Sequence, residues 1–143
     1  MQTTSNKILD LIIGEITAKV DPHLKHDATV DSIEKIFRKY KFYTTREYPI
    51  YKLRDGSGRA GRIDLVARKG KFRVAVEYDH HKLIKWKSFQ KIVQIRPEVA
   101  IGITGSGGLE ASFERGLKYK ETIKISLYII SLKERRYKLI KSG

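Results

Sequence analysis

Cysteine is absent from the 143-residue chain, which contains only three prolines and one methionine. The absence of cysteine excludes disulfide bonds, thiolate catalysis and zinc sites built on cysteine. No apolar run approaches the roughly 20 residues of a membrane-spanning helix, and Asp10 and Glu15 interrupt the apolar stretch 8–16. No small-residue cleavage site follows that stretch, as a secretion signal would require. These absences predict a cytoplasmic protein that does not span a membrane.

Acidic residues are few relative to basic ones. Sixteen Asp and Glu oppose thirty Lys and Arg, which gives a net charge of +14 and a pI of about 10. Such an excess bears on partners rather than on fold. Nucleic acid is the first candidate, because neutralising phosphates favours many dispersed cations. An anionic membrane surface and a basic surface without a dedicated partner are the alternatives.

Hydrophobic periodicity divides the chain into helices and strands without an internal repeat or a linker. Apolar residues recur at helical spacing in four segments: 5–20, 29–41, 84–95 and 109–119. Strand patterns occupy five segments, and a sixth follows a turn: 44–52, 62–68, 71–79, 99–104, 124–132 and 135–141.

The order of these elements predicts the fold class. Three consecutive strands predict an antiparallel meander, and the later alternation of strand and helix predicts parallel pairing across crossovers. We therefore expect an α/β fold with a central mixed sheet flanked by helices. The chain length is that of one domain, in which residues 1–28 form an N-terminal helical extension and about 29–132 form the core.

Two neighbouring strands carry acidic residues between apolar ones. A two-residue turn at 69–70 would set Asp64 opposite Ala75 and diagonal to Glu77. Because alternate strand residues share a face, Asp64, Glu77 and Asp79 are expected on one side of the sheet. Their apolar neighbours are expected on the other, buried side: Ile63, Leu65, Val74 and Val76.

Carboxylates gathered in this way repel one another unless a cation or a proton intervenes. Oxygen ligands of this type suit Mg²⁺ or Mn²⁺. Ordinary surface salt bridges with neighbouring Arg and Lys are the alternative. That alternative weakens here because acids are poor strand formers and three of them share a predicted face.

This arrangement resembles the PD-(D/E)XK nuclease superfamily, which includes many restriction enzymes and archaeal Holliday-junction resolvases. The resemblance covers roughly residues 29–104, in the order helix, three-stranded meander, helix, strand. Asp64, preceded by Ile63 rather than proline, matches the first motif acid, and Glu77 matches the second. Glu34 matches the helix-borne acid that many members add to the metal site. The resemblance implies a restriction-endonuclease-like fold and a Mg²⁺ or Mn²⁺ ion, which activates water for hydrolysis of DNA phosphodiester bonds.

One position departs from the family pattern, because Asp79 stands where the motif lysine follows the second acid. Some members of the superfamily supply the lysine from the following helix. Lys82, Lys85 and Lys91 are candidates for that role, and Lys85 is our choice as the catalytic lysine. Asp79 is then either a further metal ligand or the mark of a degenerate site that binds without cutting.

Basic and polar residues near these acids are the candidates for contacts with nucleic acid. Backbone amides and arginines of the loop at 55–61 suit phosphates, although a mobile hairpin tip fits equally well. The third predicted helix carries lysines and glutamines opposite its apolar side, which would line a groove or form a plain solvated face. The predicted contacts are Arg54, Arg59, Arg62, Lys82, Lys87, Gln90 and Lys91.

Three functions remain open from the sequence. The first is a metal-dependent DNA endonuclease that recognises shape or structure, such as branched DNA, with a homodimer expected by analogy only. The second is a catalytically degenerate protein that binds DNA or RNA without cleavage. The third is an interaction module whose charge only aids solubility.

Overall fold

The computed structural model describes residues 4–50, 61–80, 86–123 and 125–141. The described elements follow the predicted order of two helices, three strands, helix, strand, helix and two strands. They are α1 (Thr4–Lys19), α2 (His26–Lys39), β1 (Tyr43–Ile50), β2 (Gly61–Lys69), β3 (Phe72–Asp79), α3 (Trp86–Ile95), β4 (Val99–Thr104), α4 (Leu109–Ile123), β5 (Ser126–Ser131) and β6 (Arg136–Ile140).

The six strands form one mixed sheet in sequence order. β1, β2 and β3 pair antiparallel, β3, β4 and β5 pair parallel, and β6 returns antiparallel to β5. The helices α3 and α4 connect the parallel strands. Both connections cross the sheet in the same direction, so their common right-handedness places both helices on the same face. The predicted single-domain α/β fold with a mixed sheet flanked by helices is therefore confirmed.

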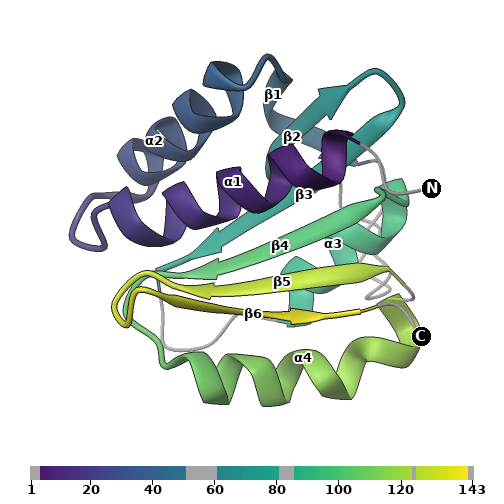
Figure 1. The fold of residues 1–143 in the computed structure, drawn as a ribbon. Coiled ribbons are helices and arrows are strands. Elements are labelled where there is room, and N and C mark those ends of the chain that lie inside the picture. The colour runs from purple at the N-terminus through teal and green to yellow at the C-terminus, as the bar shows by residue number, and fades with distance from the viewer. Residues whose placement is uncertain (1–3, 51–60, 81–85, 124, 142–143) are drawn as a thin grey trace.

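Two apolar clusters fill the space on either side of the sheet. α1 and α2 cover one face and α4 lies on the other (Figure 1). The first cluster joins these two N-terminal helices to Leu65, Val76 and Ile101 of the sheet. The second joins Ile92 of α3 and Leu109 of α4 to the opposite face. α1 thus packs into the core, and the boundary expected after residue 28 lies inside α2.

The helix α2 begins three residues earlier than its periodicity predicts. Thr29 lies inside the first turn, where its hydroxyl donates to the carbonyl of Lys25 at 3.0 Å, one turn back along the helix. The helix starts at His26, after Lys25, which provides no side-chain cap. This early start places His26 on the first turn of α2.

Charged residues in left-handed backbone conformations follow two helices. Lys41 has φ +69° after α2, and Arg96 has φ +49° after α3. The amides of Lys41 and Phe42 donate to the carbonyls of Arg38 and Phe37, which is the bonding pattern of a Schellman cap. Glycine is the usual residue at this position of the cap.

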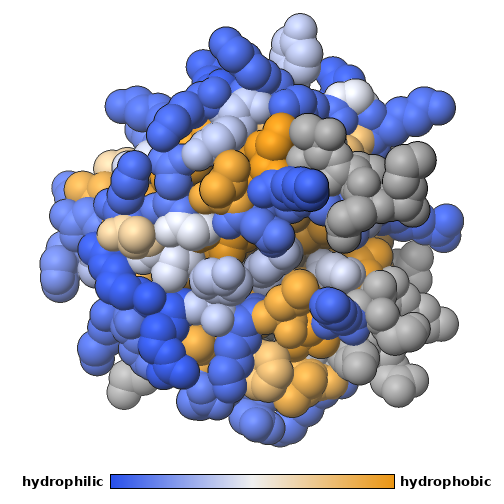
Figure 2. Space-filling view, in the orientation of Figure 1, coloured by the Kyte–Doolittle hydropathy of each residue, from blue (hydrophilic) through white to orange (hydrophobic). Residues whose placement is uncertain are grey.

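Hydrophilic side chains cover most of the surface shown in Figure 2, which is viewed in the orientation of Figure 1. None of the helices in the described ranges combines the length and apolar content needed to cross a bilayer.

Candidate active site

The hairpin of β2 and β3 brings Asp64 and Glu77 together. Its turn lies at residues 70–71 rather than at the predicted 69–70, because Gly70 adopts φ +61° at the first turn position. Two-residue hairpin turns with glycine at their first position require a positive φ there. The predicted register was therefore wrong, and Glu77 moves from a diagonal position to the position facing Asp64.

Side-chain oxygens continue the bonding between the strands where the backbone ladder ends. The last ladder pair is Leu65 with Val76. Beyond it, Glu77 Oε2 accepts the backbone N–H of Asp64 at 2.7 Å. Asp64 Oδ2 in turn accepts the backbone N–H of Tyr78 at 2.8 Å. Each carboxylate is thus fixed by a backbone group of the other strand.

The alternation of faces along β2 breaks at Asp64. Ile63 packs in the cluster on the α3 and α4 side, whereas Leu65 packs in the cluster on the α1 and α2 side. The prediction that both lie on one face was wrong. Asp64 turns toward α2, where Nε2 of His26 lies 3.4 Å from its Oδ1. Glu77 faces α3, so the three predicted acids do not all share one side.

Glu77 is the more deeply buried of the two acids. Its side chain is 3% exposed, compared with 14% for Asp64. Burial and, after it, the negative charge of Asp64 together raise the pKa of Glu77 to about 8, although Lys91 acts to lower it. Both raising effects disfavour the charged form of a carboxylate. The charged form of Glu77 therefore lacks full compensation within the metal-free protein.

Lys91 of α3 lies directly against this acid. Its Nζ is 2.5 Å from Glu77 Oε1 and donates to the carbonyl of Arg62 at 2.9 Å. We expected Lys91 on the side of its helix opposite the apolar residues, as part of a groove or of a plain solvated face, but its side chain points toward the sheet. It is one of the three lysines that we considered as a substitute for the motif lysine.

Glu34 does not join the other acids. Its carboxylate contacts Arg38 at 3.3 Å and Arg46 at 3.4 Å, and accepts the hydroxyl of Thr44 at 2.6 Å. It lies eight residues along α2 from His26, which is about 12 Å at 1.5 Å per residue. Its predicted place beside Asp64 is taken by His26.

The remaining predicted residues are only partly placed. Asp79 accepts the hydroxyl of Ser88 on α3 at 2.9 Å. Gln90 is half-buried on α3, and the side chain of Arg62 is exposed. Over the described part of the chain, no group of three or more His, Asp or Glu side chains is arranged to hold a metal ion. The predicted residues outside the described positions or side chains are Arg54, Arg59, Lys82, Lys85 and Lys87.

Tyr78 forms the wall next to the acids on the α2 side. Its ring lies 5.5 Å from the ring of His26, and its hydroxyl lies 3.0 Å from Nδ1 of His80. Gly105 packs so closely that an added Cβ would lie 2.3 Å from the tyrosine hydroxyl. Sequence reasoning missed His26, because it precedes the apolar stripe of α2 and no spacing in the chain relates it to Asp64.

In the metal-free protein, we expect stability to fall as the pH rises from about 5 to about 9. The folded-state pKa of Glu77, about 8, lies above its ordinary value of 4.5. Its contribution is therefore fully present below pH 4.5 and is lost as the pH rises through 8. A shift of this size corresponds to several kcal/mol, or on the order of 10 °C in Tm for a chain of this length.

Thermal unfolding in EDTA at several pH values measures this effect. Glu77→Gln is the matched variant, because its amide is uncharged throughout the range. We expect most of the fall in Tm to disappear in Glu77→Gln. An equal fall in both proteins would assign it to other groups.

Comparisons with known proteins give little more. No family model and no curated protein matches the sequence. A solved structure described as "Crystal Structure of Protein of Unknown Function AF1548" is similar to 68% of this chain, with 16% identity and a TM-score of 0.44. The chain spans about half of that protein, at 54% of its length.

Proposed function

We propose that the protein is a metal-dependent endonuclease that hydrolyses DNA phosphodiester bonds and selects its substrate by shape or structure. Asp64 and Glu77 are the proposed metal ligands, and Lys91 is the proposed catalytic cation. The observation that carries the proposal is the meeting of two carboxylates from adjacent strands with a lysine from the following helix.

The donor set fits Mg²⁺ or Mn²⁺. Mg²⁺ is commonly held by one or two carboxylates together with waters and substrate phosphates, so two acids suffice. Each carboxylate oxygen that accepts one hydrogen bond retains a further lone pair for a cation. The raised pKa of Glu77 also fits, because a divalent ion would relieve the repulsion between the two acids. When bound, such an ion lowers the pKa of a water and stabilises negative charge on the phosphate.

The residues of the chain have distinct tasks in this proposal. Asp64 and Glu77, each held by a backbone N–H group of the other strand, bind the cation. The ammonium group of Lys91 stabilises charge that develops on the phosphate, which is where fixed cations contribute most to catalysis. His26, whose Nε2 lies 3.4 Å from Oδ1 of Asp64, positions that carboxylate.

The order and pairing of the elements also support the proposal. The helix α2, the meander of β1 to β3, the helix α3 and the parallel strand β4 follow the layout that the superfamily resemblance implies. Lys91 supplies from α3 the lysine that Asp79 replaces on the strand. The net charge of +14 favours a phosphate-rich partner. The proposal places the protein in the cytoplasm.

A second candidate is a protein of the same layout that binds DNA or RNA without cutting. Two observations favour it. Asp79 stands at the motif lysine position, and Glu77 is already engaged at both oxygens, by Lys91 and by a backbone N–H. A cation would have to share these oxygens with the existing partners.

The two candidates are separated by a cleavage assay on supercoiled, branched and single-stranded DNA, in EDTA, Mg²⁺ or Mn²⁺. We expect cutting that requires the metal, together with salt-sensitive binding in EDTA. Tight binding without cutting in either metal would contradict the endonuclease and support the second candidate. A lack of binding at low salt would contradict both.

A further inference from the structure

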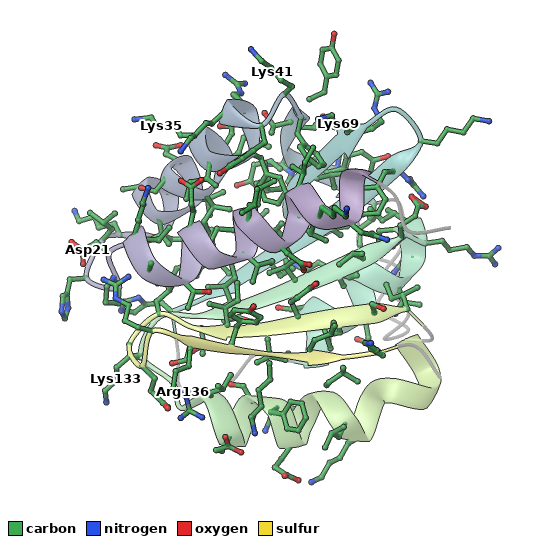
Figure 3. All side chains as sticks on the ribbon, in the orientation of Figure 1. Asp21, Lys35, Lys41, Lys69, Lys133 and Arg136 are labelled. Atoms are coloured by element: carbon green, nitrogen blue, oxygen red, sulfur yellow. The ribbon has the colours of Figure 1, made fainter. Side chains whose placement is uncertain are left out.

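The far end of the β2–β3 hairpin is strongly basic. Segments 35–45 and 67–73 each contain four Lys or Arg and no Asp or Glu. The fold joins these segments, since β1 pairs with β2 and Lys69 Nζ donates to the carbonyl of Tyr40 at 3.1 Å. Figure 3 labels Lys41 and Lys69 at this end. We define the hairpin-end patch as Lys41, Tyr43, Arg68, Lys69 and Lys71.

Tyr43 stands in the middle of this charge. It is 74% exposed, more than the other exposed large apolar side chains of the described residues. The guanidinium of Arg68, its partner across the strands, lies 5.5 Å from the centre of the ring. A single exposed aromatic residue is common on proteins, but this ring is held by a cation and stays open to solvent.

Within the described part of the chain, the cations of the patch do not form ion pairs with acids. Among the ion pairs of the described residues, none involves Lys41, Arg68, Lys69 or Lys71. Nearby Lys39, by contrast, pairs with Glu15 at 3.0 Å. The charge of the patch is therefore available to an external anion, and an aromatic ring among such cations is the usual platform for single-stranded nucleic acid.

The patch and the acid pair lie on connected parts of the sheet. Tyr43 is opposite Arg68, and Arg68 is opposite Arg73, so these three residues form a row across β1, β2 and β3. Glu77 is four residues beyond Arg73 on β3, on the same face. Four residues of strand span about 13 Å, which is about four steps of one DNA strand at 3.4 Å per step.

We infer that the hairpin-end patch binds an unpaired segment of a DNA substrate, with a base stacked on Tyr43 and phosphates contacted by Arg68 and the lysines. The inference rests on the proposed function for the identity of the substrate. Its chemistry is independent, because stacking and phosphate contacts need neither a metal nor cleavage. Since every base has a π-face, the patch selects unpaired bases without regard to sequence.

Binding of fluorescein-labelled 20-mers, single-stranded and duplex, is measured by anisotropy in EDTA for four forms of the full chain: wild type, Tyr43→Ala, Tyr43→Phe and Tyr137→Ala. The loss of one stacked base predicts a roughly 5- to 150-fold weaker affinity of Tyr43→Ala for the single strand. Duplex affinity is expected to change less than about 2-fold. Tyr43→Phe keeps the ring and the affinity.

Tyr137 is the matched control, because it is 43% exposed beside Arg136 on β6, and Tyr137→Ala should bind as wild type does. Thermal unfolding verifies that the variants are folded. Equal single-strand affinity of Tyr43→Ala and wild type, an equal loss on duplex, or an equal loss in Tyr137→Ala would overturn the inference. Binding that behaves as expected without any cleavage in Mg²⁺ or Mn²⁺ would support the patch and remove only the endonuclease proposal.

Discussion

Asp64→Asn is expected to abolish metal-dependent DNA cleavage while leaving a folded protein that binds DNA. Asparagine has nearly the same shape, and its carbonyl oxygen can still accept the N–H of Tyr78 that Asp64 Oδ2 accepts now. The variant lacks the negative charge that a divalent ion requires. Losing several kcal/mol of charge stabilisation corresponds to a rate lower by a factor on the order of 10³. Plasmid nicking under single-turnover conditions, with excess protein and saturating Mg²⁺, measures this rate.

Asp31→Asn is the control for Asp64→Asn. Asp31 is also an aspartate with a basic partner, but it pairs with Arg46 on the surface and its side chain is 57% exposed. We expect its cleavage rate to remain within about 2-fold of wild type, since exposed ion pairs contribute little. Cleavage by Asp64→Asn at the wild-type rate would remove Asp64 from the active site. Anisotropy in EDTA shows whether both variants still bind DNA.

Lys91→Met is expected to lower kcat by about 10²- to 10³-fold, the usual effect of removing one fixed charge-stabilising group. DNA affinity in EDTA should change little, because this lysine faces the sheet and contacts Glu77 and the carbonyl of Arg62. Methionine fills much of the same space, so packing is largely retained. Steady-state cleavage rates over a range of DNA concentrations separate the effect on kcat from the effect on KM.

Two further results test the role of Lys91. Lys91 lowers the pKa of Glu77, so Lys91→Met should move the acid limb of the pH–rate profile to higher pH. Lys85→Ala tests our original choice from the sequence and should keep the cleavage rate within a few-fold. If Lys85→Ala lost activity and Lys91→Met kept it, the catalytic lysine would be Lys85.

The type and order of the helices and strands could be predicted, because they depend on patterns within short segments of the sequence. Burial of a periodic apolar stripe fixes the type of each element, and the sequence order of strands fixes which of them pair. The mixed sheet and the helix on each connection were therefore predictable. The register of the hairpin was not predictable, since it depends on which turn residue takes a positive φ. Gly70 takes it as the first residue of a turn at 70–71, whereas we expected Gly70 to be the second residue of a turn at 69–70.

The site was only partly predictable, because its contacts join elements that are distant in the sequence. Asp64 and Glu77 were found from strand patterning, and the structure brings them together. Glu34 was placed by resemblance, but Arg38 and Arg46 hold it elsewhere. Lys91 was a candidate for the catalytic lysine and a predicted nucleic-acid contact, but its pairing with Glu77 was not predicted. Helical periodicity considers one helix alone, so it cannot predict that a lysine turns toward a buried carboxylate on a strand.

The caps after α2 and α3 have a consequence for how the chain distributes its charge. Lys41 and Arg96 occupy left-handed conformations that cost an L-residue about 1 kcal/mol relative to glycine. A cation at the end of a helix recovers part of this cost by interacting with the helix dipole. Glycine at either corner would relax the backbone but would leave that corner neutral. Lys41 and Arg96 therefore keep a backbone strain that glycine would remove. In return, each of these hydrogen-bonded bends carries a positive charge.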